Sequence, residues 1–189
     1  MKTLKNKKIL IGITGGIATY KVCSIINHLR KEEAEVKVIL TKSASKFINP
    51  ITFESLSGSF VYTDEFIPQE RGGVEHIELA KWADVMLIAP ATANTIGKIS
   101  SGIADNLLTT VVMATEIDIP VVICPAMNTK MWENPIVQKN ITFLKNIKSK
   151  NKEKYFFIEP VKGELVCGDV GIGKMAKNED IVDFIKNIK

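Results

Sequence analysis

Short apolar runs alternate with longer amphipathic segments along the whole chain. The apolar runs are bounded by Gly, Pro or polar residues, which is typical of buried strands, and the amphipathic segments repeat their apolar residues at helical spacing. The pattern predicts strands at residues 8–14, 35–40, 60–62, 84–89, 119–124 and 155–158. It predicts helices at about residues 18–32, 50–58, 94–100, 105–114, 135–145 and 180–188.

This alternation over residues 1–189 predicts one α/β domain, doubly wound in the manner of Rossmann and flavodoxin-like folds. We expect a mostly parallel sheet with right-handed crossovers and helices on both faces. The segment 64–73 contains Pro68, Gly72 and Gly73 and is expected to be a loop. No repeat or linker in the sequence divides the chain into two domains.

Composition narrows the classes of function. The chain is 46% apolar and 24% charged, and its net charge of +4 comes largely from lysines that we expect to be solvated. Arginines and aromatic residues are not interleaved with these lysines, so nucleic acid is not an expected partner. The sequence shows no apolar run of membrane-spanning length and no signal sequence, so we expect a cytoplasmic protein. Three cysteines and two histidines fit neither a disulfide framework nor a metal site.

The first predicted strand runs into a glycine-rich turn, GITGGIA at residues 12–18. Gly15 and Gly16 would let the backbone approach a phosphate at the start of the next helix, although a purely structural turn is an equal alternative. No Gly-Lys-Ser/Thr follows, so the turn is not a P-loop, and no acidic residue ends the second strand to bind a ribose. Thr41 and Ser43 stand there instead, and their hydroxyls suit a phosphate or the edge of a flavin.

The strand at 84–89 is followed by PATANTIGK at residues 90–98. Its small residues and hydroxyls leave room for a flat ring and for hydrogen bonds to the polar edge of that ring. Asp105, which begins the next predicted helix, is a candidate ligand contact or simply an N-cap. Because the carboxyl ends of parallel strands share one sheet edge, these segments are expected to converge with the glycine-rich turn.

The strand at 119–124 is followed by PAMNTKMW at residues 125–132, which carries a polar Asn128 among bulky apolar residues. The Asn128 amide would fix a small polar group such as a carboxylate inside an apolar pocket. The alternative is that Asn128 caps the next helix and that the Met and Trp residues belong to the core.

Two further residues are chemically suggestive. His76 lies outside any long predicted helix and is either an acid/base or a structural residue. Cys167 lies within the glycine-rich segment 163–173, which has the character of a flexible flap that closes over a ligand, or of a surface loop with an inert thiol. Cys23 and Cys124 are expected to pack in the core.

His76, PAMNTKMW and the CGDVGIGKM stretch at 167–175, in this order and spacing, resemble the flavoprotein family of homo-oligomeric, FMN-containing cysteine decarboxylases. Within that family they are most similar to the phosphopantothenoylcysteine decarboxylases, and HIELAKWAD at 76–84 reinforces the likeness. The resemblance extends from the GITGGIA turn to Met175. Because the chain ends at Lys189, it resembles the stand-alone form, with phosphopantothenoylcysteine ligase as a separate neighbour in the pathway.

The resemblance implies FMN-dependent decarboxylation of 4'-phosphopantothenoylcysteine to 4'-phosphopantetheine, in coenzyme A biosynthesis. The flavin would oxidise the substrate thiol, CO2 would leave, and the product would be reduced again. His76 would act as acid/base, Asn128 would hold the carboxylate and Cys167 would donate a proton. The implied FMN-binding residues are Gly15, Gly16, Ile17, Thr41, Ser43, Ala91, Thr92, Ala93 and Asn94. The implied substrate-binding residues are Asn128, Met131 and Lys174.

The resemblance also implies a homotrimer, or a dodecamer built from trimers, with the active site between subunits and His76 facing a neighbour's flavin. Val166 stands where the family commonly has Ala, and Lys174 stands where it commonly has Arg, so the bidentate fork of an arginine is missing. The alternatives are a related flavoprotein acting on a peptidyl C-terminal cysteine, or a non-catalytic FMN-binding regulatory subunit. A flavin prenyltransferase is disfavoured, because it would have neither PxMNxxMW nor the Cys167 segment.

Overall fold

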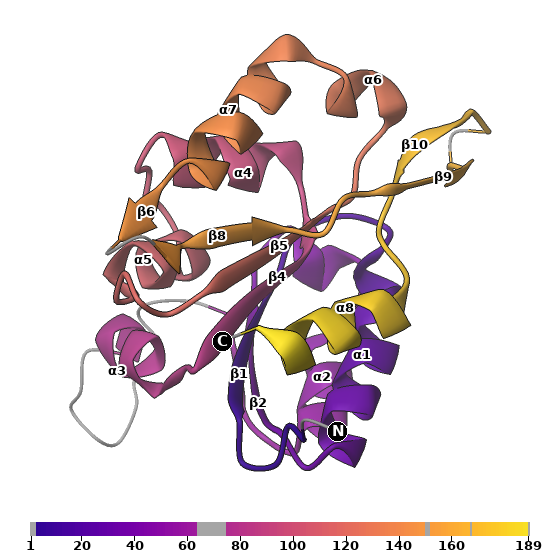
Figure 1. Cartoon of the computed structure of the whole chain (residues 1–189). Helices are drawn as coiled ribbons and strands as arrows, with labels where there is room; N and C mark the ends of the chain where they lie inside the picture. Colours follow the sequence, from indigo (N-terminus) through magenta and orange to yellow (C-terminus); the bar gives the residue numbers. More distant parts are fainter. Residues whose placement is uncertain (1–2, 64–74, 150–151, 167, 189) are drawn as a thin grey trace.

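The computed structural model describes residues 3–63, 75–149, 152–166 and 168–188 (Figure 1). A parallel six-stranded sheet has the order β3-β2-β1-β4-β5-β8, which reverses direction between β1 and β4. This architecture confirms the predicted doubly wound α/β fold. The strands are β1 Lys8–Ile13, β2 Glu35–Leu40, β3 Val61–Tyr62, β4 Val85–Ala91, β5 Val121–Pro125 and β8 Tyr155–Phe157.

Helices cover both faces of this sheet (Figure 1). The first face carries α1 Thr19–Lys31, α2 Pro50–Ser57 and α8 Asn178–Asn187. The second face carries α3 Glu75–Trp82, α4 Ala93–Ser100, α5 Leu107–Ala114 and α7 Pro135–Lys145. The remaining short elements are the 3-10 turn Ala44–Lys46, α6 Thr129–Trp132, β6 Lys148–Ser149, β7 Lys152–Glu153, β9 Val161–Glu164 and β10 Val170–Lys174.

Burial on two sides explains why the central strands are almost uninterruptedly apolar. Every residue of β4 and β5 is buried, as expected for parallel strands between two helical layers. The helices bury one stripe each, and α1 does so with Val22, Ile25, Ile26 and Leu29. Among the described residues, no helix combines the length and the apolar character needed to cross a membrane.

Several elements differ from the predicted pattern, and two differences lie near the residues of interest. The third long strand was expected to end at residue 89, but β4 continues through Pro90 to Ala91, with a cis bond between Ala89 and Pro90. The pairing of β4 with β5 shifts between Ile88 and Ala91, so the missing N–H of Pro90 falls where the ladder is already irregular. Helix α3 was not predicted, because it buries only Leu79 and Ala80 and therefore has a weak apolar periodicity. The predicted loop 64–73 lies outside the described residues.

Candidate functional site

A cavity of about 470 Å³ lies beyond the carboxyl ends of β1, β4 and β5, where the strand order reverses. Ligands of open α/β sheets bind in this crevice. The turn after β1, the start of α4, the turn after β5 and the β9–β10 hairpin form its walls. The predicted site residues that line it are Gly15, Gly16, Ile17, Thr92, Ala93, Asn128, Met131 and Lys174.

A buried threonine ties the first two strand ends together. Thr14 Oγ1 donates to the Pro90 carbonyl at 2.6 Å and accepts from the Thr92 N–H at 3.1 Å. One turn later, Thr19 Oγ1 donates to the Gly16 carbonyl at 2.6 Å. These bonds fix the glycine-rich turn and the start of α4 as adjacent walls of the cavity.

Gly15 of this turn is required by its surroundings, and Gly16 keeps the cavity beside it open. A Cβ on Gly15 would lie 2.4 Å from Ser43 Cβ, and a side chain on Gly16, whose Cβ would meet only Thr92 Cγ2 at 4.0 Å, would occupy the cavity. Within the described part of the chain, the N–H groups of Gly15, Gly16 and Ile17 make no hydrogen bond. The turn therefore offers donors and free space to an anionic group.

The segment after β2 lies beside this turn but not in the cavity lining. Thr41 Oγ1 donates to the Ile13 carbonyl at 3.1 Å, which anchors the segment to the end of β1. Ser43 is exposed and packs against Gly15. The structure therefore brings Thr41 and Ser43 to the predicted edge, next to the cavity wall.

At the end of β4, some of the predicted FMN-binding residues line the cavity and others do not. Thr92 caps α4 by accepting from the Thr95 N–H at 3.3 Å, and Thr92 and Ala93 line the cavity. Ala91 is fully buried within β4, and Asn94 lies outside the lining.

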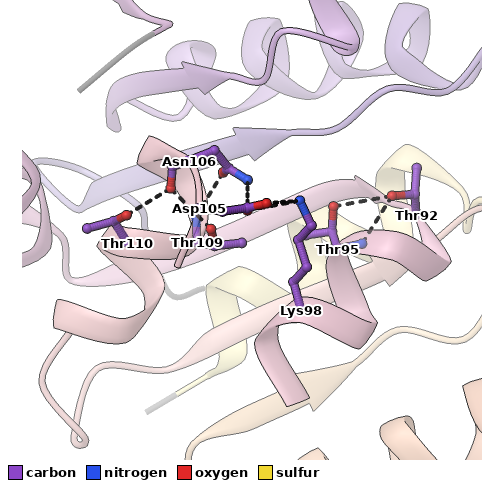
Figure 2. Close-up of polar contacts among 7 residues, drawn as sticks. All are labelled: Thr92, Thr95, Lys98, Asp105, Asn106, Thr109 and Thr110. Carbon is purple, nitrogen blue, oxygen red and sulfur yellow. Dashed lines mark hydrogen bonds and ion pairs between the residues drawn. The ribbon is translucent and has the colours of Figure 1, made fainter. Parts of the chain in front are cut away.

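Figure 2 shows the polar network that joins α4 to the start of α5. Lys98 Nζ lies 2.7 Å from Asp105 Oδ2, and the Asn106 amide donates to Asp105 Oδ1 at 2.9 Å. Asn106 Oδ1 accepts from the Thr109 N–H at 3.1 Å, so Asn106 caps α5 and the expectation that Asp105 does so is wrong. The hydrogen bond from Lys98 lowers the pKa of Asp105.

Asn128 combines the two roles considered for it. Its Oδ1 accepts from the Lys130 N–H at 2.8 Å, which confirms a capping role at α6, and its side chain also lines the cavity. Met127 and Met131 line the cavity beside it, whereas Trp132 is buried in the core. The amide therefore lies in an apolar wall with its orientation fixed by the cap.

The glycine-rich segment 163–173 was expected to be a flap, and the structure adds regular structure to it. Strands β9 and β10 form an antiparallel hairpin that extends from the main sheet beside α6 (Figure 1). The Met127 N–H donates to the Gly173 carbonyl at 3.0 Å, and a Cβ on Gly173 would lie 2.1 Å from the Met127 carbonyl oxygen. A Cβ on Gly171 would lie 2.2 Å from Thr129 Oγ1. The glycines thus allow the hairpin to dock closely on the Asn128 turn.

Cys167 falls between the two strands of the hairpin and lies outside the described residues. The other cysteines pack as expected. Cys124 is fully buried, and Cys23 is half-buried against the same core cluster. Burial raises the pKa of both thiols, which keeps them protonated and unreactive.

Lys21 is a cavity residue that the sequence did not reveal. It lies on the first turns of α1 and lines the cavity together with Ile17 and Tyr20. Its Nζ donates to the Met175 carbonyl at 3.2 Å, and burial together with the nearby charge of Lys174 lowers its pKa. The helical spacing of residues 17, 20 and 21 after the glycine-rich turn is the signal that could have indicated it.

His76 is not brought to the cavity by its own chain. It is half-buried on α3, at the opposite end of the molecule from the β9–β10 hairpin (Figure 1). Helix α3 packs against α5 on the second face of the sheet. The described residues that line the cavity of this chain therefore include no histidine.

Comparisons with known proteins agree with this geometry. The family model described as Flavoprotein matches residues 1–188. The chain is 46% identical over 179 residues to the coenzyme A biosynthesis bifunctional protein CoaBC of Bacillus subtilis. The aligned residues make up 95% of this chain and 42% of that protein. The chain thus spans less than half the length of this relative.

A second relative has nearly the same length as this chain. It is the probable phosphopantothenoylcysteine decarboxylase of Streptococcus mutans, 42% identical over 180 residues, which cover 95% of this chain and 97% of that protein. Among solved structures, a cysteine-to-serine mutant of PPC decarboxylase complexed with pantothenoylaminoethenethiol superposes with a TM-score of 0.83. It is 34% identical, with 96% of this chain and 97% of that chain covered.

Proposed function

The chain belongs to the Flavoprotein family, and on this premise we propose that it binds FMN and decarboxylates 4'-phosphopantothenoylcysteine to 4'-phosphopantetheine in coenzyme A biosynthesis. One observation carries the proposal: a single cavity at the reversal of strand order collects the glycine-rich turn, Asn128 and the β9–β10 hairpin. The names of the Streptococcus mutans relative and of the solved PPC decarboxylase support the choice of substrate.

The residues present fit FMN. Gly15 and Gly16 leave a space without side chains, the N–H groups beside them suit a phosphate, and the apolar walls of the cavity suit a flat ring. Thr92 and Ala93 would hold the opposite edge of the ring. When bound, FMN would take up and return the electrons of the substrate thiol, which provides the electron sink needed for loss of CO2.

The substrate would lie between the flavin site and the hairpin. The cap bond to Lys130 N–H fixes the amide of Asn128, whose Nδ2–H group is the donor suited to a carboxylate. Met131 would form the apolar wall beside it, and excluding water from this wall strengthens the contact. We propose that Cys167, in the hairpin segment, donates the proton that completes the product.

The acid/base would come from a second subunit. We propose that His76 of a neighbouring chain completes the site in a homotrimer, because His76 is not among the residues that line the cavity of its own chain. The large exposed side chains Ile17 and Tyr20, which are 53% and 59% exposed at the cavity rim, support an interface at this place.

The experiment that tests the function follows two signals in the purified protein. Titration with FMN should give a yellow protein with bound flavin, and the flavin-loaded protein should release labelled CO2 from carboxyl-labelled 4'-phosphopantothenoylcysteine. A protein that cannot be loaded with FMN would overturn the proposal. A loaded protein that releases CO2 only from a peptide ending in cysteine would replace the substrate with the peptidyl alternative.

A further inference from the structure

Two lysine side chains reach the same cavity from different elements. Lys21 comes from the first turns of α1 and Lys174 from the end of β10, and both line the cavity. The Lys21 ammonium donates to the Met175 carbonyl at 3.2 Å, which places it next to the backbone of Lys174. The Lys174 side chain crosses β9, because a Cβ on Gly163 would lie 3.2 Å from its Cδ and 3.8 Å from its Nζ. The Lys174 side chain thus lies against β9, and the Lys21 side chain lies against the backbone that follows β10.

Among the described residues, no carboxylate neutralises the charges of these two lysines. Within the described part of the chain, neither Lys21 nor Lys174 forms an ion pair with a carboxylate, although Glu164 also lines the cavity. Lys21 is half-buried, and both burial and the charge of Lys174 lower its pKa. Two like charges at the edge of an apolar cavity repel each other, and a dianionic group bound between them would relieve that repulsion.

We propose that Lys21 and Lys174 form a subsite for a phosphate monoester, and that this subsite selects the phosphorylated form of the substrate over its unphosphorylated form. The inference rests on the proposed function, which supplies a substrate with a carboxylate at one end and a phosphate at the other. Asn128 would hold the carboxylate end, while the lysines hold the phosphate between the end of β10 and the start of α1. Lys21 is thereby a specificity-determining residue.

Phosphate monoesters have two sources at this site, the substrate and FMN. The Gly15–Gly16 turn already offers N–H donors for the cofactor phosphate, whereas the lysine pair belongs partly to the hairpin. A lysine is a point charge on a flexible stem that binds phosphate without a bidentate fork. We therefore assign the pair to the substrate phosphate, and the experiment separates the two sources.

The test compares two substrates in variants of the flavin-loaded protein. For Lys21→Met, Lys174→Met and the double variant, kcat/KM is measured with 4'-phosphopantothenoylcysteine and with pantothenoylcysteine. The ratio of the two values should fall about tenfold or more for each single variant, which is the range of one charged hydrogen bond. Lys21→Arg should recover most of the ratio. Lys31→Met, which removes an exposed charge from the far end of the same helix, should keep the wild-type ratio.

Binding gives a readout that does not depend on turnover. Calorimetry should show that 4'-phosphopantetheine binds more tightly than pantetheine, that this difference shrinks in Lys21→Met, and that it shrinks with rising salt. Loss of bound FMN in the lysine variants would assign the pair to the cofactor phosphate and overturn the proposal. A wild type that uses both substrates equally well would also overturn it while leaving the decarboxylase function intact. A wild type that uses neither would instead contradict the function itself.

Discussion

At the scale of single residues, a substitution of Asn128 can separate its role in capping helix α6 from its proposed role in substrate binding. Aspartate caps helices as well as asparagine does, so Asn128→Asp should keep the bond to the Lys130 N–H. The new carboxylate would repel the substrate carboxylate and would offer it no amide donor. Turnover should therefore fall at least about a hundredfold, while the melting temperature stays close to that of the wild type. Steady-state kinetics and thermal unfolding measure the two effects.

Asn134 provides the matched control for this substitution. It caps α7 in the same way, with Oδ1 accepting from the Ile136 N–H at 2.9 Å, but it does not line the cavity. Asn134→Asp should keep both turnover and stability. Equal losses of turnover in Asn128→Asp and Asn134→Asp would show that the loss does not come from a contact between the Asn128 amide and the substrate carboxylate.

Lys154 makes a second prediction at this scale, about stability and pH. Its side chain is buried and donates to the carbonyls of Thr115, at 3.3 Å, and Glu116, and burial lowers its pKa to about 8. Between about pH 8 and about pH 10.5 the unfolded chain therefore binds more protons at this lysine than the folded chain does. The stability of wild type relative to Lys154→Met should rise with pH across this window by at least about 1 kcal/mol.

Chemical denaturation of both proteins at several pH values measures this difference. Comparing wild type with the variant removes the contributions of all other titrating groups. A difference in unfolding free energy that stays constant across the window would show that Lys154 is equally charged in the folded and unfolded states.

The sequence could identify a site residue only where a local pattern, such as a preceding apolar strand, marked its place. Asn128, Thr92 and the Gly15–Gly16 turn follow apolar strands directly, so their place at the sheet edge could be predicted. Lys21 could not be identified in this way, because its role depends on the Met175 carbonyl and on Lys174, more than 150 residues away in the chain. Asp105 was considered as a possible cap, which its neighbour Asn106 provides instead, because both residue types are common N-caps.

At the scale of elements, the docking of the β9–β10 hairpin on the Asn128 turn controls the site. Gly173→Ala would place a methyl group 2.1 Å from the Met127 carbonyl oxygen and would push the two segments apart. We expect a loss of turnover of at least about tenfold, because small displacements from a reacting geometry are costly. Hydrogen exchange of the Met127 amide should become faster, because its bond to Gly173 is lost.

Gly97→Ala is the control for this element. Gly97 lies within helix α4, and a Cβ on it would make an ordinary contact at 3.7 Å with the amide of Asn140 on α7. The substitution should leave turnover intact and stabilise the fold by about 0.5–1 kcal/mol, because alanine favours helices over glycine. If Gly173→Ala were as active as Gly97→Ala, close docking of the hairpin would be unnecessary.

Elements were predictable where their apolar pattern was strong. Strand β2 and helix α7 have the predicted bounds, since each combines a clear pattern with clear end signals such as Pro135. The hairpin was expected only as a flap, because its glycines hide strand periodicity and its two strands are largely exposed. Its pairing depends on contact with the Asn128 turn, which a local pattern cannot encode.

At the scale of the whole molecule, the separation of His76 from the cavity predicts complementation between subunits. His76→Asn and Asn128→Asp chains should each be inactive alone. In mixed trimers, some interfaces combine the intact His76 of one chain with the intact Asn128 of another. Random mixing of equal amounts should restore activity at about one quarter of the sites, as expected for heterologous interfaces.

Activity of co-expressed and separately purified variants measures this effect, and light scattering reports the oligomer. Mixed oligomers that remain inactive would show that both residues act within one chain or that His76 plays no part. The sequence pattern alone placed Asn128 at the end of a strand, but it did not predict helix α3, which carries His76. The expectation that the active site lies between subunits came only from the family resemblance, because assembly leaves no local pattern in the sequence.

The central claim is that this cavity, loaded with FMN, removes CO2 from 4'-phosphopantothenoylcysteine without net oxidation. Mass spectrometry of the product formed by the wild-type, flavin-loaded protein tests it most directly. We predict a single product with the mass of 4'-phosphopantetheine, formed by wild type and not by Asn128→Asp. Substrate recovered unchanged from the flavin-loaded wild type would contradict the claim.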